Sequence, residues 1–198
     1  MIPEPIKKFV NLIAQLPSIG PRQATRLAFY LVGLGKAQIN ELASAIDALK
    51  NLRTCKDCFF VYTSGDALCY VCSDARRHKD VIMIVEKETD LISIEKTKKF
   101  NGRYFVLGDL KKNGALDTIQ KLRLNSLKIQ IKNGGGTAKE IILAINPTTI
   151  GDLNAELITR ELNDCAQKTT RLGRGLPTGG EIEFADEETL SAALERRS

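Results

Sequence analysis

Two Cys-x-x-Cys pairs constrain the fold of this chain more than any other feature of its sequence. Cys55 pairs with Cys58 and Cys69 with Cys72, and ten residues separate the two pairs. Two such turns supply the four sulfur ligands that a tetrahedral structural zinc prefers, so we expect one zinc per chain. Because sulfur fills every position, none is open for water, and this zinc should hold structure without doing chemistry. Two disulfides are the alternative, disfavoured because no secretory segment marks the chain for an oxidising compartment.

The charge balance weakly favours a polyanionic partner. The 198 residues include 29 basic and 24 acidic side chains, for a formal net charge of +5. His78 is the only histidine and lies in a charged run, so we interpret it as solvated and not as part of a nucleophilic site. The sequence contains neither a signal-peptide pattern nor an apolar stretch long enough to span a bilayer. We therefore expect a soluble cytoplasmic protein that makes no membrane contact.

The first fifty residues predict helices. Apolar residues recur at helical spacing in residues 6–16, and a second helix begins at Pro21, a residue favoured at the first helical position. A third helix is predicted over residues 39–52. A short Gly-containing turn between the first two helices is typical of a helix-hairpin-helix, whose turn amides and helix N-terminus face a phosphate without reading bases. Ser18 replaces the motif's usual first glycine, and an ordinary helical hairpin is the alternative.

Four basic residues are the candidate DNA contacts. Arg22 and Arg26 lie just inside the second helix, and Lys7 and Lys8 extend the same patch from the first. Binding through phosphates should be independent of sequence and should weaken steeply as salt is added, since each neutralised phosphate releases a counterion. Solvated surface charge is the alternative interpretation of these side chains.

The rest of the chain alternates between strand and helix patterns, which favours a parallel α/β sheet. Short apolar runs predict strands at residues 81–85, 103–107 and 141–145. Helices are predicted over residues 89–97, 115–122 and 154–167, the last containing Cys165 as a small buried residue. Residues 123–132 alternate like a strand but can equally end a helix, and both options stay open. After the helix predicted over 154–167 comes a glycine-rich segment, residues 170–180, and then a short helix that Asp186 caps.

We accordingly divide the chain into four parts. Residues 1–53 form the helix-hairpin-helix region, 54–78 the four-cysteine finger, 79–175 an α/β domain and 176–198 a C-terminal segment with a helix.

This order of parts resembles the RecR family of bacterial recombination mediators. The resemblance rests on Leu-Pro-Ser-Ile-Gly-Pro-Arg at 16–22, Cys-Tyr-Val-Cys-Ser-Asp-Ala-Arg-Arg at 69–77 and Arg-Gly-Leu-Pro-Thr-Gly-Gly at 174–180. It implies that the α/β part is a Toprim-type domain. It also implies a cytoplasmic, nucleoid-associated homo-oligomer, a ring, dimer or tetramer, that binds single- and double-stranded DNA. Such a protein acts in DNA repair with RecO, and in many bacteria RecF, to load RecA.

The resemblance also permits a check for catalysis. Toprim enzymes hold magnesium with a glutamate after the first strand and an Asp-x-Asp after a later one, and Glu86 stands at the first position. The later acidic positions are occupied instead by Asn146, Thr148 and Ile150. The carboxylates that remain for an acidic site are Glu86, Asp90 and Asp152. Because a hard cation needs several anionic oxygens, we expect no enzyme activity. Zinc is the cofactor that we expect, and magnesium is the less favoured one.

Two other function classes stay open on sequence alone. One is a magnesium-dependent Toprim nuclease or strand-passage enzyme. The other is a zinc-ribbon transcription factor that reads bases, which leaves the α/β part without a role.

Overall fold

The computed structural model describes residues 2–63, 65–111 and 114–195, and it separates into two compact units, residues 1–52 and 53–198. No helix in the described ranges combines the length and the apolarity needed to cross a bilayer.

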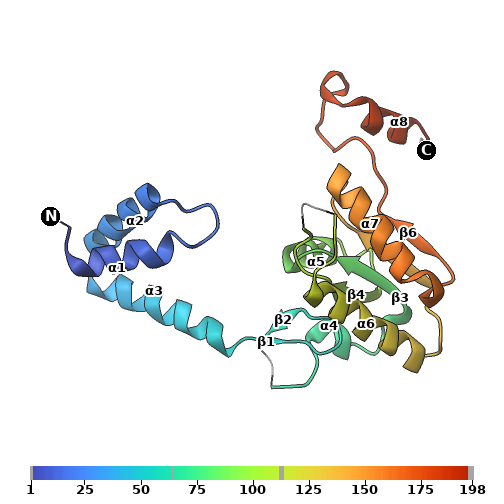
Figure 1. The fold of residues 1–198 in the computed structure, drawn as a ribbon, viewed down its shortest axis with the longest axis horizontal. Helices are drawn as coiled ribbons and strands as arrows, with labels where there is room; N and C mark the ends of the chain where they lie inside the picture. The colour runs from blue at the N-terminus through green and yellow to red at the C-terminus, as the bar shows by residue number, and fades with distance from the viewer. Residues whose placement is uncertain (1, 64, 112–113, 196–198) are drawn as a thin grey trace. The chain divides into compact units, whose positions relative to one another are not determined.

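The first unit is a bundle of helices (Figure 1). Its elements are α1 (Glu4–Ile13), α2 (Pro21–Leu34), α3 (Lys36–Ala48) and the 3₁₀ turn η1 (Leu49–Asn51). α2 packs against α1 and α3, and the small side chains of Ala24 and Ala28 are the buried positions on α2. The predicted start of α2 at Pro21 is confirmed. Ser18, in the turn before it, has a φ of 63°, the left-handed conformation that glycine adopts most easily.

The second unit is built on a four-stranded parallel sheet in the order β4-β3-β5-β6 (Figure 1). The strands are β3 (His78–Val85), β4 (Gly102–Val106), β5 (Glu140–Ala144) and β6 (Thr169–Arg171). The strands predicted from the three apolar runs are present. β6 was not predicted, because its three residues carry no apolar run.

Helices connect these strands and continue beyond them. They are α5 (Glu88–Lys96), α6 (Thr118–Asn133), α7 (Thr149–Glu161), the 3₁₀ turns η2 (Asn163–Cys165) and η3 (Ile182–Phe184), and α8 (Glu187–Glu195). Asp186 caps α8 as predicted, accepting a hydrogen bond from the Thr189 amide at 2.8 Å. Residues 123–132, left open by the sequence, are helical and belong to α6.

Several predicted helices have different bounds from those observed. The helical pattern over 6–16 corresponds to α1, which ends at Ile13, and the helix predicted over 39–52 begins earlier, at Lys36, and gives way to η1 after Ala48. The helix predicted over 115–122 begins at Thr118, after the cap at Asp117, and runs on to Asn133. The helix predicted over 154–167 begins earlier, at Thr149, because the Thr148 hydroxyl accepts a hydrogen bond from the Gly151 amide and caps it. It also ends earlier, so that Cys165 lies in η2; the prediction that this cysteine is buried is confirmed.

Each face of the sheet has its own hydrophobic core. On one face Ile84 and Phe105 pack with Leu127 of α6 and Ile158 of α7. On the other face Met83, Val85 and Tyr104 pack with Leu91 of α5 and with residues of the cysteine segment. The cysteine segment comprises β1 (Arg53–Thr54), β2 (Val61–Tyr62) and α4 (Tyr70–Ser73). It therefore covers part of the sheet and helps to form its second core. The expected α/β fold with helical N-terminal region, four-cysteine cluster and C-terminal helix is confirmed.

Candidate metal centre and nucleic-acid interface

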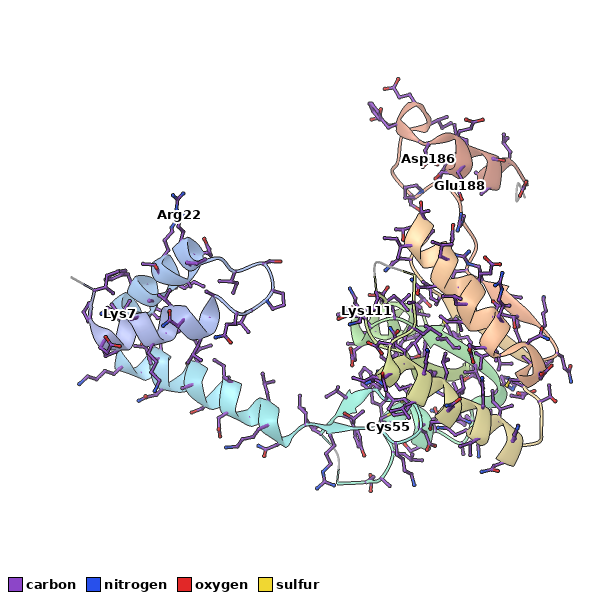
Figure 2. The ribbon with its side chains drawn as sticks, in the orientation of Figure 1. Lys7, Arg22, Cys55, Lys111, Asp186 and Glu188 are labelled. Carbon is purple, nitrogen blue, oxygen red and sulfur yellow. The ribbon has the colours of Figure 1, made fainter. Side chains whose placement is uncertain are left out.

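The first cysteine pair lies in the turn of a two-stranded antiparallel hairpin. β1 and β2 flank Cys55 and Cys58, and the amide of Cys55 donates to the carbonyl of Phe60 at 2.8 Å. Phe59, directly after Cys58, has a φ of 62°. This left-handed residue reverses the chain behind the two thiols, a conformation that is rare for a bulky side chain. Figure 2 shows Cys55 in this segment.

The second pair is presented by a helix N-terminus. Cys69 is the N-cap of α4 and Cys72 lies within that helix. The Cys69 amide donates to the Cys55 sulfur at 3.5 Å, which ties the second turn to the first. Amide donors to sulfur and the positive end of a helix both favour thiolates.

The four sulfurs converge on one point. All lie within 4.8 Å of one another. A zinc ion with Zn–S distances of about 2.3 Å holds its sulfurs about 3.8 Å apart, so the cluster matches such a site closely. Cys55, Cys58 and Cys69 are fully buried, and all five cysteines of the chain are free thiols in this structure. The arrangement can hold a metal with four-sulfur coordination, and it leaves no position for a substrate.

The thiols perturb one another strongly. The pKa of the Cys69 thiol is held far below its ordinary value, first by its contact with Cys58 and then by that with Cys72. The pKa values of Cys58 and Cys72 are raised in turn, in each case first by a contact with a neighbouring thiol of the cluster. One thiolate therefore forms readily among partners that stay protonated. A bound dication reverses this balance, because it favours the thiolate form at all four positions.

The cysteine segment is fixed to the sheet by contacts from both sides of its first turn. The Val106 amide donates to the Cys58 carbonyl at 2.8 Å, and the Gln130 side chain of α6 donates to the Asp57 carbonyl at 3.0 Å. The Phe59 ring meets Phe105 edge-on at 5.4 Å, and the Arg123 guanidinium lies 4.8 Å from the centre of the Phe59 ring. Sequence reasoning missed this docking because all the contacts are distant in the chain.

The four predicted DNA contacts all lie in the first unit. Arg22 and Arg26 are one helical turn apart on α2 and exposed, and Figure 2 shows the Arg22 side chain extending away from the α1–α2 hairpin. Lys8 is exposed on α1, whereas Lys7 pairs with Glu4 at 3.2 Å. No described side chain caps the N-terminus of α2. Pro21 has no amide hydrogen and the Ala24 amide donates to the Gly20 carbonyl at 2.9 Å, so the Arg22 and Gln23 amides are the ones left available to an anion.

Each of the three carboxylates of the candidate Toprim site accepts hydrogen bonds or forms ion pairs within the protein. Glu86 accepts hydrogen bonds from the Leu110 amide and from the Asn146 side chain, both at 3.1 Å. Asp90 accepts from the Lys87 amide at 2.9 Å at the start of α5. Within the described residues, the four cysteines are the one group of three or more metal-ligating side chains with converging ligand atoms. The structure does not bring the three acids together as such a group.

Asp152 instead belongs to an ion cluster that the sequence did not predict. Arg171 and Arg174 both pair with its carboxylate, and Arg174 also pairs with Glu188 of α8. The pKa of Asp152 is lowered, first by the hydrogen bond from Arg171 and then by the charges of both arginines. These groups line a cavity of about 580 Å³ at the carboxyl ends of β5 and β6. The signal available in the sequence was the pair of arginines in the glycine-rich segment.

Comparisons with known proteins match most of the chain. A RecR helix-hairpin-helix model matches residues 6–50, a Toprim-domain model residues 80–172 and a RecR C-terminal model residues 175–198. The chain is 37% identical to recombination protein RecR of Frankia alni over 196 residues, which are 97% of this chain and 95% of the relative. It is 38% identical to recombination protein RecR of Frankia casuarinae, with the same coverage of both chains.

Proposed function

The chain belongs to the RecR family of recombination proteins, and from this premise we propose that it is a non-catalytic mediator of recombinational DNA repair. It binds single- and double-stranded DNA without regard to sequence. It acts with RecO, and with RecF where that protein is present, to promote loading of RecA on single-stranded DNA. Its place of action is the cytoplasm, at the nucleoid.

The observation that carries the DNA-binding part is the open N-terminus of α2. The Arg22 and Gln23 amides in its first turn have no side-chain cap. Arg22 and Arg26 stand on one face of the same helix without a described carboxylate partner. Amides and guanidinium groups recognise phosphate oxygens, and neither arginine needs to reach a base for binding. Lys8 adds a third exposed cation from α1, and Lys7 contributes once its pairing with Glu4 is exchanged for a phosphate.

We propose that Cys55, Cys58, Cys69 and Cys72 hold one structural zinc per chain. Four sulfur donors, three of them fully buried, suit zinc and exclude the oxygen-preferring cations. When bound, the metal supplies crosslinking and no open coordination position. Because the same cysteines help to form the second core of the sheet, the zinc stabilises the face on which α5 also packs.

The absence of turnover is supported by what surrounds Glu86 and Asp152. The Glu86 carboxylate accepts hydrogen bonds from two donors, and the Asp152 carboxylate forms ion pairs with two arginines. An arginine pair beside a carboxylate competes with a metal for the same oxygens. Asn146 meets Glu86 through its amide nitrogen, a group that repels a cation. A magnesium ion at this place has to displace these contacts.

Self-association is supported by apolar side chains on the first unit. Few of its side chains are buried, and large residues on α2 and α3 stay exposed: Tyr30 (64%), Val32 (62%) and Ile46 (57%). Exposed apolar groups at this density favour an interface between copies of the chain. We propose a ring-forming homo-oligomer on this basis and on family membership.

The test is the salt dependence of DNA binding by the zinc-loaded full chain. Fluorescence anisotropy with two unrelated labelled sequences measures the slope of log Kobs against log[salt]. Arg22→Gln with Arg26→Gln should flatten this slope on duplex DNA by about 1.8, which is about 0.9 for each phosphate that is no longer neutralised.

The matched control is Lys36→Gln with Lys50→Gln, which removes the same charge from the same unit but away from the start of α2. Its slope should stay near that of the unchanged protein. Equal slopes for all three proteins, or a strong preference for one of the two sequences, would contradict the proposal.

A further inference from the structure

The amino-terminal edge of the parallel sheet carries a row of lysines. Because all four strands are parallel, their first residues lie along one edge. Lys79 lies at the start of β3, Lys139 directly precedes β5, and Lys168 directly precedes β6. Lys98 and Lys99 lie in the loop that leads into β4, and Lys132 lies in the last turn of α6, whose loop leads into β5. A lysine thus stands at or near the start of every strand.

Backbone hydrogen bonds place the strand starts side by side. The His78 amide donates to the Asn101 carbonyl at 2.9 Å, which joins the start of β3 to the loop before β4. The Lys139 amide donates to the Asp80 carbonyl at 2.8 Å, and the Ile141 amide to the Lys168 carbonyl at 2.9 Å. Neighbouring strands are about 4.8 Å apart, so the row extends over roughly 15 Å.

These cations are not neutralised by the part of the protein that the structure describes. All six lysines are exposed, and none forms an ion pair with a described carboxylate. By contrast Lys87, Lys111 and Lys128, elsewhere in the same unit, each pair with an acid. The same edge also carries acidic residues. Glu140 accepts a hydrogen bond from Thr170, and Asp80 and Asp164 are exposed. Glu95 and Glu161, in the last turns of α5 and α7, are paired with Arg77 and Lys128. The excess of positive charge is therefore local to this edge.

Helix polarity explains only part of the row. The C-termini of α5, α6 and α7 point to this edge, and a lysine in a last helical turn, as Lys132 is, complements the helix dipole. Lys79, Lys139 and Lys168 are strand-start residues outside any helix, so this effect does not account for them. Lys79 and Arg103 also line a hollow of about 240 Å³ at the end of α6, which makes the surface concave beside the row.

We propose that this amino-edge row is a second DNA-binding surface of the chain. It takes the phosphate backbone of a DNA strand, with no base contact, since lysine side chains act as point charges toward phosphate. The proposal rests on the DNA-binding function proposed above, and it adds phosphate contacts in the second unit to those of Arg22 and Arg26 in the first. A linear array of cations at strand spacing suits a polyanionic chain better than a single small anion.

The test compares three variants of the zinc-loaded full chain. The edge variant carries Lys79→Gln, Lys139→Gln and Lys168→Gln, whose side chains make no described ion pair. The control variant carries Lys87→Gln, Lys121→Gln and Lys128→Gln, which removes the same charge from other places on the same unit. The third is the hairpin variant with Arg22→Gln and Arg26→Gln. Anisotropy titrations with single-stranded DNA give affinity and salt slope, and thermal melting with zinc content confirms that each variant is folded.

The edge variant should lose about tenfold or more in affinity at physiological salt and should flatten the slope by about 2, roughly 0.7 for each of three phosphates. The control variant should keep both values near those of the unchanged protein. A weakened hairpin variant beside an unaffected edge variant would overturn the second surface and leave the proposed function intact. No DNA binding by the unchanged protein would overturn both.

Two further outcomes also count against the second surface. Equal weakening in the edge and control variants would show that net charge alone matters. An edge variant that binds DNA normally but loses binding to a polyglutamate peptide would assign the row to an acidic protein partner instead.

Discussion

Phe59 offers a sharp test of how the cysteine segment is held. Its φ of 62° is unfavourable for any residue with a Cβ, yet its ring packs against Phe105 at 5.4 Å and beneath Arg123 at 4.8 Å. Substitution by glycine relieves the backbone but removes the ring. Substitution by alanine removes the ring and leaves the backbone strained. Comparing the two separates the two effects.

The packing effect should exceed the backbone effect. Truncating a fully buried phenylalanine costs about 3–5 kcal/mol, and for this half-buried ring we expect about 2–3 kcal/mol. A left-handed residue with a Cβ costs about 1 kcal/mol, which only the glycine variant recovers. Both variants should therefore be less stable than the unchanged protein, and Phe59→Gly should be more stable than Phe59→Ala by about 1 kcal/mol. This order is the reverse of the usual one.

Urea unfolding followed by circular dichroism, with zinc release measured in parallel, gives the free energies. Phe60 is the matched control, because it is the next residue, is buried, meets Tyr70 edge-on at 6.0 Å and has no positive φ. At Phe60 the alanine variant should be at least as stable as the glycine variant. The reasoning is refuted if glycine is the worse substitution at both positions, or if either Phe59 variant matches the unchanged protein.

Three other sites give predictions of their own. Ser18→Gly should stabilise the first unit by up to about 1 kcal/mol, because Ser18 has a φ of 63° and is exposed, and thermal melting should show Ser18→Ala without this gain. Cys72→Ser should abolish stoichiometric zinc binding and expose the second core of the sheet to protease, while Cys165→Ser should keep one zinc per chain. Arg171 and then Arg174 lower the pKa of Asp152. Their pairing with Asp152 therefore stabilises the fold at pH values above the ordinary carboxyl pKa of about 3.9, and this stabilisation is lost as the pH falls through the lowered pKa. Melting curves of the unchanged protein and Asp152→Asn should differ at neutral pH and converge in acid; a constant difference at every pH would refute this.

The sequence predicted those features that depend on residues close together in the chain, namely the cysteine turns and the helix starts. The spacing of the cysteines was enough to predict that their sulfurs meet, since each pair lies in one turn. Pro21 and Asp186 marked helix starts because a first-turn proline and an N-cap carboxylate act within a few residues. The interpretation of residues 1–53, 54–78, 79–175 and 176–198 as separate parts stays a prediction; the contacts divide the chain into residues 1–52 and 53–198.

Residues 123–132 show where periodicity fails. Leu124, Leu127 and Ile131 are buried at helical spacing along α6, but Ile129 between them is 59% exposed. An exposed isoleucine makes the segment alternate like a strand, and only the neighbouring sheet reveals which apolar residues are covered. The three-residue strand β6 was missed for a related reason, because pairing with β5 and not its own sequence makes it a strand.

The site contacts that the sequence did not predict are those between residues far apart in the chain. Neither the packing of Phe59 on Phe105 nor the pairing of Asp152 with Arg171 has a signature in adjacent residues. The hydrogen bonding of the Glu86 carboxylate likewise involves Asn146, sixty positions away, whose side chain donates to it. The sequence identified these residue types, but the fold decides which of them meet.

We propose that this protein holds DNA and leaves its phosphodiester bonds intact. The most direct test incubates the zinc-loaded chain with supercoiled plasmid and with end-labelled single-stranded DNA, in excess magnesium and at concentrations where anisotropy shows saturated binding. A non-catalytic mediator should leave the length and the topology of the bound DNA unchanged. Magnesium-dependent nicking, relaxation or shortening that disappears in Glu86→Gln would contradict it.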